Sequence, residues 1–265
     1  MIILIHTSKM MRPAESNNRS VLSQPLLLAK TTILVNNLKT LSQEDIEKMM
    51  KISPKLAMAT KNLILSWNND LSYLRPAIDS FLGDIYSGLQ VASLTEKDRL
   101  YANQHVRILS GLYGILRPLD GIYPYRFEMG YRLPLSDVAN LYHFWETSIA
   151  DTLVKNEPIV DLTALEYSKT VTKYIEPTRI VTPRFLTQNK KGGRNVGEPV
   201  FVVVHAKIAR GAFANWMIRH RIEDIERLKD FTEIGYLYSE VLSTVAVPVF
   251  VCQEFKGLGL SVRLS

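Results

Sequence analysis

The sequence opens with five consecutive apolar residues, 1–5, and the run stops at His6. A run this short without a polar residue predicts a buried β-strand, because both faces of the strand need cover. Residues 199–205, with their β-branched centre, predict a second strand of the same kind. We therefore expect residues 1–5 and 200–204 to lie in one sheet, with helices packed on its faces.

Shorter patterns predict the elements around this sheet. Residues 42–45 and 95–98 each have a serine or threonine followed three positions later by an acid, a capping box that starts a helix. Further helices are predicted over residues 24–41, 55–65, 76–82, 97–109 and 207–220, and further strands over residues 158–162, 180–186 and 245–251. The first strand must pair with these later strands. We predict one domain over residues 1–265, of mixed α/β (α+β) class, with a central mixed sheet flanked by helices.

The chain has one cysteine, Cys252, so no disulfide can form within it, as is usual in a reducing compartment. Cys252 follows an apolar run, which favours a buried structural thiol over a redox sensor. Five apolar residues are too few for a signal-peptide core, and no apolar run approaches the roughly 20 residues that span a bilayer. We expect a soluble, cytoplasmic protein that does not bind a membrane.

Positive charge is in modest excess, with 32 Lys and Arg against 26 Asp and Glu and a net charge of +6. This balance permits a nucleic-acid partner without demanding one. The five histidines are scattered without the spacing of metal ligands, and the sequence has no Walker loop, dinucleotide fingerprint or nucleophile elbow. We therefore predict no metal and no cofactor.

Two glycines, Gly111 and Gly114, lie between apolar stretches of residues 104–120. The segment resembles a helix-hairpin-helix, in which a glycine hairpin lets backbone N–H groups approach a DNA phosphate. The usual hairpin separates its glycines by one residue, and here two residues separate them. The alternative is an ordinary helix–turn–helix corner that packs its leucines and isoleucine into the core.

These residues and several other runs make the chain resemble the YaaA peroxide stress family over nearly its full length. The runs are 81–89 (FLGDIYSGL), 109–120 (LSGLYGILRPLD), 124–130 (PYRFEMG), 142–145 (YHFW) and 205–211 (HAKIARG). The resemblance implies a mixed α/β fold peculiar to the family, protection during hydrogen-peroxide stress, and DNA binding through a basic cleft with a hairpin of this kind. The family's first strand is usually followed by Ser-Pro-Ala-Lys-Thr-Leu. This chain instead reads Thr-Ser-Lys-Met-Met after His6, which keeps the lysine and lacks the proline.

Three cations follow the two strongest predicted strands. Lys9 comes just after residues 1–5, at the carboxyl end of a strand, where α/β proteins commonly place binding groups. Lys207 and Arg210 stand three positions apart, on one face of a helix's first turn, where the helix dipole does not favour cations. If the strands are parallel neighbours, the three side chains meet and could bind phosphate. The alternative is a solvated loop lysine and a solvated helix face.

Four more residues are candidates. Arg117 and Arg126 lie in a segment rich in proline and tyrosine, which suits phosphate and stacking contacts with nucleic acid. Arg126 would equally suit an internal pair with Glu128. Asp161 and Glu166 follow a predicted strand and are candidates for acid–base chemistry or for balancing the cations.

The leading hypothesis is a cytoplasmic protein that binds the phosphates of double-stranded or distorted DNA during peroxide stress. The alternative is an enzyme acting on a nucleotide, a nucleic acid or a small phosphorylated ligand, with Lys9, Asp161, Glu166, Lys207 and Arg210 lining one cleft. No pattern in the sequence proves a reaction, which favours the binding protein. A third hypothesis is indirect protection through iron homeostasis, by lowering free iron.

Overall fold

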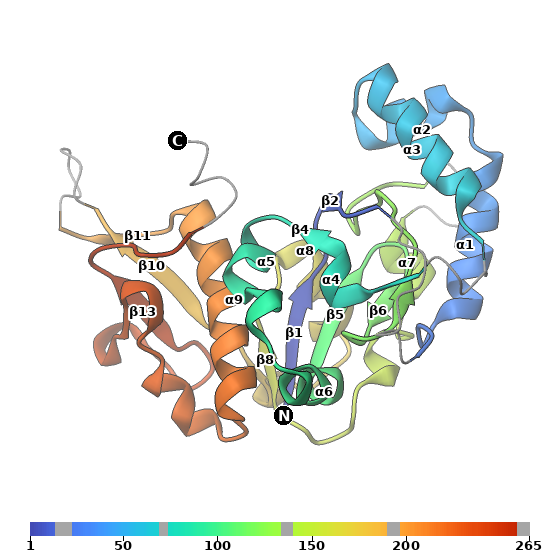
Figure 1. Ribbon diagram of the computed structural model, residues 1–265. Helices are drawn as coiled ribbons and strands as arrows, with labels where there is room; N and C mark the ends of the chain where they lie inside the picture. Colours follow the sequence, from blue (N-terminus) through green and yellow to red (C-terminus); the bar gives the residue numbers. More distant parts are fainter. Residues whose placement is uncertain (14–22, 69–73, 134–139, 190–196, 259–265) are drawn as a thin grey trace.

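The computed structural model describes residues 1–13, 23–68, 74–133, 140–189 and 197–258. Its centre is a mixed five-stranded sheet in the order β6-β5-β1-β8-β9 (Figure 1). Strand β1 (Ile2–His6) is buried along its whole length, as predicted, and it pairs in parallel with β5 (Val106–Ser110) and β8 (Ile159–Asp161). Strand β9 (Ile180–Val181) continues the sheet in parallel, and β6 (Gly114–Leu116) returns antiparallel to β5. The mixed α/β class and the central mixed sheet are therefore confirmed.

A second sheet has the order β11-β10-β13-β12. Its strands are β11 (Pro199–Val200), β10 (Arg184–Gln188), β13 (Val249–Cys252) and β12 (Tyr236–Tyr238). The predicted strand over residues 199–205 is wrong, because only two of these residues are a strand and they lie in the second sheet rather than beside β1. Helix α9 (Val203–His220) begins within the run. Phe201 and Val203 are more than half exposed, so the run is not the core strand that its valines suggest.

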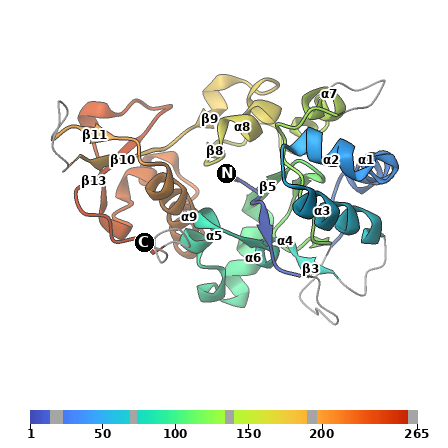
Figure 2. The same ribbon diagram turned by 90° about the horizontal axis from the view of Figure 1, so that it is seen from above.

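Helix α9 lies between the two sheets and contacts both β1 and β10 (Figures 1 and 2). It also packs directly on α5 (Asp84–Leu89), where a Cβ added to Gly211 would lie 1.8 Å from the Ile85 carbonyl oxygen. A Cβ added to Gly88 would lie 2.0 Å from the Ile208 carbonyl oxygen. Two glycines thus let the backbones of α5 and α9 touch, and this contact fixes where the first turns of α9 stand.

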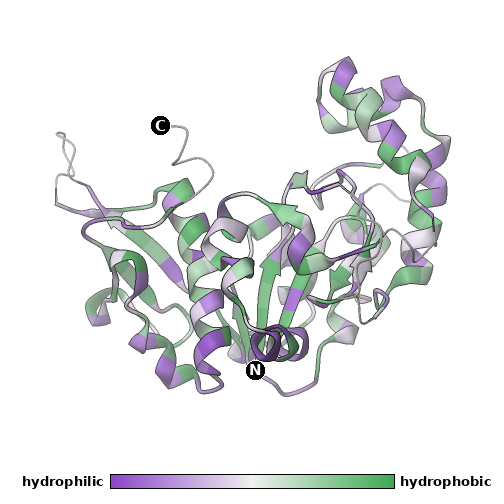
Figure 3. Cartoon of the chain, viewed as in Figure 1, coloured by the Kyte–Doolittle hydropathy of each residue, from purple (hydrophilic) through white to green (hydrophobic). Residues whose placement is uncertain are grey.

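Both predicted capping boxes are confirmed. Ser42 and Asp45 start α2 (Gln43–Met50), and Thr95 and Asp98 start α6 (Glu96–His105). The helix predicted over residues 97–109 ends at His105, because the apolar residues that follow form β5 inside the sheet. The strands of the central sheet are largely hydrophobic (Figure 3). Polar residues alternate with apolar ones along α1 (Leu28–Thr40), α2 and α3 (Pro54–Ser66), on the far side of β6 (Figures 1 and 3).

The other elements complete the described parts of the chain. The remaining helices and strands are α1 (Leu28–Thr40), α3 (Pro54–Ser66), α4 (Ala77–Ser80), α7 (Leu141–Trp145), α8 (Leu165–Thr172), β2 (Met10–Met11), β3 (Arg75–Pro76), β4 (Phe81–Leu82) and β7 (Gly121–Ile122). Short 3-10 helices cover Val91–Ser93, Ala150–Thr152, Pro177–Arg179, Ile225–Asp230, Glu233–Gly235 and Glu240–Leu242. Cys252 is buried, as expected. Within the described ranges, no helix is long and apolar enough to cross a membrane.

Candidate functional site

The carboxyl ends of the parallel strands β1 and β8 meet at one edge of the central sheet, the upper edge in Figure 1. Lys9 follows β1, and Asp161 is the last residue of β8. Helix α8 and the first turns of α9 lie at the same edge, which Figure 2 shows from above. We call the residues gathered here the edge cluster: His6, Lys9, Glu128, Asp161, Glu166, Tyr167, Lys207 and Arg210.

His6 lies at the base of the edge cluster and is 7% exposed. Its Nδ1 accepts a hydrogen bond from the Ala164 backbone N–H at 3.2 Å, and its ring stacks on Tyr167 with centroids 4.8 Å apart. Burial lowers the pKa of His6 to about 3, and the positive charges of Arg210 and then Lys207 act in the same direction. His6 is therefore neutral at physiological pH, and with Nδ1 as acceptor it carries its proton on Nε2.

Asp161 is 3% exposed, and both of its carboxylate oxygens are occupied. Oδ1 accepts hydrogen bonds from the Thr163 backbone N–H at 2.9 Å and from the Thr163 hydroxyl at 2.6 Å. Oδ2 accepts a hydrogen bond from the Ser168 hydroxyl. Burial lowers the pKa of Arg210, and the charge of Asp161 opposes that shift. This geometry favours charge balancing over proton transfer as the role of Asp161.

Glu128 and Glu166 bring negative charge to the cluster. Glu128 Oε2 lies 2.8 Å from Lys9 Nζ. Burial raises the pKa of Glu166, repulsion from Glu128 raises it further, and the charges of Lys9 and Lys207 oppose the shift. A Cβ added to Gly130 would lie 2.9 Å from Glu166 Oε2, so the glycine leaves the space that this carboxylate occupies. Two carboxylates and two lysines therefore share one small region.

Within the edge cluster, Lys207 and Arg210 are the two cations without a direct partner among the described residues. Lys207 is exposed and Arg210 is half-buried. Among the described residues, neither has a hydrogen-bond acceptor or an ion-pair partner within reach, although both act electrostatically on His6. The structure thus brings Lys9, Asp161, Glu166, Lys207 and Arg210 to one edge, as the sequence predicted. The reason differs from the one expected. The sequence analysis assumed that a strand paired with β1 would lead to Lys207 and Arg210, whereas the packing of α9 beside β1 brings these two residues to the edge.

Buried tyrosines form the floor beneath the cluster. The Thr7 hydroxyl donates to the Tyr167 oxygen at 3.2 Å, and the Tyr125 and Ser110 hydroxyls lie 2.6 Å apart. The Tyr86 hydroxyl donates to the His6 carbonyl at 3.2 Å. Burial raises the pKa of Tyr86, Tyr125 and Tyr167, so these groups remain neutral. Sequence reasoning did not identify His6, Thr7 or Tyr167, although the position of His6 and Thr7 at the end of the first strand was a usable signal.

The helix-hairpin-helix interpretation of residues 104–120 is wrong. The chain forms β5, a tight turn and β6, and the turn is buried. A Cβ added to Gly111 would lie 2.7 Å from the Glu128 carbonyl carbon, and one added to Gly114, at φ +70°, would lie 3.0 Å from the Trp145 ring. Both glycines therefore accommodate packing inside the protein, and they do not present N–H groups to a phosphate. The predicted burial of the neighbouring apolar side chains is confirmed, in a β-hairpin instead of a helical corner.

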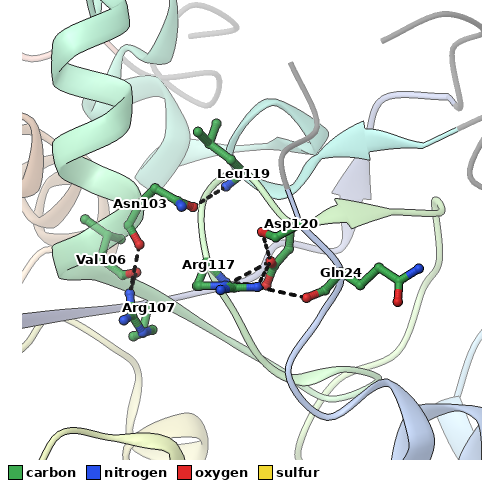
Figure 4. Close-up of polar contacts among 8 residues, drawn as sticks. Gln24, Asn103, Val106, Arg107, Arg117, Leu119 and Asp120 are labelled. Atoms are coloured by element: carbon green, nitrogen blue, oxygen red, sulfur yellow. Dashed lines mark hydrogen bonds and ion pairs between the residues drawn. The ribbon is translucent and has the colours of Figure 1, made fainter. Parts of the chain in front are cut away.

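Arg117 lies outside the edge cluster and holds a loop together (Figure 4). Its Nε donates to Asp120 Oδ1 at 3.0 Å, and its Nη2 donates to the Gln24 carbonyl at 3.0 Å. Asp120 is fully buried and also accepts a hydrogen bond from the Ser23 hydroxyl at 2.5 Å. The contacts of Arg117 are therefore those of a structural residue and not of a free phosphate ligand.

Arg126 borders the edge cluster without joining Glu128. Its Nη1 donates to the Lys9 carbonyl at 3.4 Å, and its Nε is buried without a hydrogen-bond partner in the described parts of the chain. Glu128 pairs with Lys9 instead, so the internal Arg126–Glu128 pair that the sequence left open is not formed. Arg126 thus connects the loop of residues 125–130 to the segment that carries Lys9.

Comparison with known proteins extends over nearly the whole chain. The family model described as "Peroxide stress protein YaaA" matches residues 1–242. A UPF0246 protein of Salinispora tropica is 55% identical over 263 residues, with 99% of this chain and 98% of the relative covered. A UPF0246 protein of Clostridium beijerinckii is 38% identical (94% and 97% covered), and one of Aliivibrio fischeri is 35% identical (96% and 99% covered). The chain belongs to the YaaA family of peroxide stress proteins.

Proposed function

We propose that this protein binds phosphate groups of DNA at the edge cluster and protects the cell in this way during hydrogen-peroxide stress. The observation that carries the proposal is the pair Lys207 and Arg210, which have no direct partner among the described residues. A half-buried guanidinium without a partner loses hydration and gains no hydrogen bonds in return. A phosphate oxygen would provide both the charge and the acceptors, because the guanidinium can donate two parallel hydrogen bonds.

The rest of the edge cluster supports an anion at this position. His6 is neutral, so it adds no positive charge next to Arg210. Asp161 balances part of the charge of Arg210 but keeps both oxygens on Thr163 and Ser168. Lys9 adds a third cation, held 2.8 Å from Glu128. Contacts of this kind recognise the phosphate backbone and do not read the identity of the bases. We therefore expect the protein to bind DNA without strong sequence preference.

A salt titration of DNA binding tests the proposal. Each phosphate contact contributes roughly one unit to the slope of log affinity against log salt. Lys207→Ala and Arg210→Ala should each weaken binding and flatten the slope by about one unit. Lys97→Ala is the matched control, because Lys97 is an exposed lysine on α6 and its removal changes the net charge equally. If Lys97→Ala and Lys207→Ala changed the affinity and the salt slope equally, the effect would be one of net charge alone. That result would refute the assignment of Lys207 as a phosphate contact.

A second candidate function is catalysis on a nucleotide, a nucleic acid or a small phosphorylated ligand. The observation that favours it is Glu166, whose pKa is raised by burial and by Glu128, while the charges of Lys9 and Lys207 oppose that shift. A carboxyl group perturbed in this way is suited to general acid–base work. Glu166→Gln separates the two functions, since loss of turnover with DNA affinity retained would indicate an enzyme. A Glu166→Gln protein that turns over such substrates like the wild type would exclude this role for Glu166.

A further inference from the structure

Strand β2 follows Lys9 directly and consists of two methionines. Met10 and Met11 pair with Leu82 and Phe81 of β4 in a two-stranded sheet. The Met11 Sδ atom accepts a hydrogen bond from the Tyr125 backbone N–H at 3.3 Å. A thioether is a weak acceptor, so this contact is easily changed by chemistry at the sulfur.

The Met11 contact is one of three that join residues 9–11 to residues 125–128. The others are the Arg126 hydrogen bond to the Lys9 carbonyl, at 3.4 Å, and the Lys9–Glu128 ion pair, at 2.8 Å. The residues that make these three contacts are neighbours in sequence within each of the two segments. A displacement of the Met11 sulfur from Tyr125 therefore acts directly on the position of Lys9 relative to Glu128.

Exposure sets Met10 apart from most methionines of the chain. Met10 is 45% exposed and Met58, on α3, is 49% exposed. Four others are buried, namely Met1, Met50, Met129 and Met217. An open groove lined by Arg12, Phe81 and Leu82 runs beside the β2–β4 pair, so solvent reaches this sheet. Two strands of two residues each are held by few hydrogen bonds, so we expect Met11 to become accessible by local opening.

We propose that Met10 and Met11 form an oxidation site, and that hydrogen peroxide converts them to sulfoxides that change the edge cluster. In the reaction the peroxide O–O bond breaks and one oxygen forms a bond to the thioether sulfur. The second oxygen leaves as water, the sulfur loses two electrons and the peroxide is reduced. Each step consumes one peroxide molecule and needs no other reactant. The sulfoxide is reversible by methionine sulfoxide reductases.

Oxidation of Met11 places a polar oxygen between the sulfur and the Tyr125 N–H. This oxygen moves β2 away from residues 125–128 and separates Lys9 from Glu128. Lys9 is then free to meet an external anion, so the oxidised protein binds phosphate more tightly than the reduced protein. The binding part of this inference rests on the proposed function, whereas the modification and the release of Lys9 do not.

The experiment treats the full-length protein with graded hydrogen peroxide and maps sulfoxides by peptide mass spectrometry. Two further readouts are the labelling rate of Lys9 by an amine-acetylating reagent and the affinity for a short DNA duplex. We expect sulfoxides at Met10 and Met11 as well as at Met58. Lys9 should be labelled faster, whereas the labelling rate of Lys97 should not change. The affinity for the duplex should rise about two- to fivefold, which corresponds to the free energy of one exposed ion pair. Reductase treatment should reverse all three changes.

Matched variants decide the outcome. Met11→Leu should fold normally, since the swap conserves volume, and should lose the response, while Met58→Leu should respond like the wild type. Met11 left unmodified when Met58 is fully oxidised, or a Met11→Leu protein that still responds, would overturn the inference. If neither the reduced nor the oxidised protein binds the duplex, the proposed function fails. The labelling rate of Lys9 then still tests the inference, since faster labelling after oxidation supports it and an unchanged rate refutes it.

Discussion

Lys9 and Glu128 join two loops of the protein through an ion pair of 2.8 Å, and Glu166 responds to both of them. The lysine follows the central strand β1, and the glutamate belongs to a loop whose backbone lies against Gly111, in the turn between β5 and β6. Glu128 raises the pKa of Glu166 while Lys9 lowers it. The charge state of Glu166 thus depends on a pair that links two distant parts of the sequence.

This dependence predicts pKa shifts of opposite sign at Glu166 when Glu128 or Lys9 is replaced. Glu128→Gln removes a negative neighbour and should lower the pKa of Glu166, whereas Lys9→Ala removes a positive one and should raise it. Titration of the Glu166 carboxyl carbon by NMR, in the two variants and the wild type, measures both shifts. Lys97→Ala serves as the control and should leave the titration unchanged. Shifts of the same sign in both variants would contradict the described arrangement.

His6 should make the protein sensitive to acid. Its pKa is about 3 in the folded protein and near 6.5 in the unfolded chain, so the unfolded chain binds the additional proton. The stability that the neutral ring allows is complete above pH 6.5 and is lost progressively as the pH falls towards 3. The loss amounts to a few kcal/mol at most, by the linkage of pKa to stability.

The replacement His6→Asn tests this prediction, because the asparagine side-chain oxygen can still accept the Ala164 N–H bond that Nδ1 accepts now. Denaturant unfolding at pH 7 and at pH 4.5 gives the difference in stability for each protein. The wild type should lose more stability than His6→Asn between the two pH values. An equal loss in both proteins would show that other groups account for the acid sensitivity.

Local signals in the sequence predicted those parts of the fold that local interactions decide. The capping boxes at Ser42 and Thr95 each require only a side chain three positions away, and both are formed. The burial of β1 followed from an uninterrupted apolar run. Lys9 could be placed at the sheet edge because it follows this run closely, after His6, Thr7 and Ser8. The extent of the single domain, residues 1–265, stays a prediction.

Other parts depend on contacts between distant residues, which no local pattern reveals. The valines before His205 favour a strand by propensity, yet α9 begins at Val203 and packs against α5. Residues 106–110 continue a helical pattern, yet they complete the central sheet as β5. The sequence placed the cations Lys207 and Arg210 on a helix, but the strand expected to bring that helix beside β1 lies in the second sheet.

Gly111 should be a packing residue with no separate role in DNA binding. A side chain there would meet the backbone at Glu128 and Phe127, at 2.7 and 2.8 Å. Gly111→Val should therefore lower stability by about 1 to 3 kcal/mol or more, as overpacking does. A thermal melt beside a DNA titration separates the two effects. The folded fraction should lose DNA affinity only to the extent that the substitution displaces the loop of residues 125–130. If Gly111→Val were fully stable and still lost DNA binding, Gly111 would have a role in phosphate binding after all.

A single methyl group at Gly211 should disturb the backbone contact between α9 and α5. The Cβ of Gly211→Ala would lie 1.8 Å from the Ile85 carbonyl oxygen and 2.6 Å from the Leu89 nitrogen, both backbone atoms that cannot rotate away. Helix α9 must then move off α5, and we expect a loss of about 3 kcal/mol or more in the free energy of unfolding. Because α9 carries Lys207 and Arg210, any folded fraction should also bind DNA more weakly.

The control for this prediction is Gly197→Ala. Among the residues that the structure describes, Gly197 has no atom beyond its chain neighbours within 4 Å of an added Cβ, and its φ of +91° leaves backbone strain of about 1 kcal/mol. Urea unfolding of both variants gives the comparison, and Gly211→Ala should have the clearly lower midpoint. A midpoint equal to that of Gly197→Ala would mean that α5 and α9 separate without cost. The backbone contact of the two helices would then not be what fixes the cations at the edge cluster.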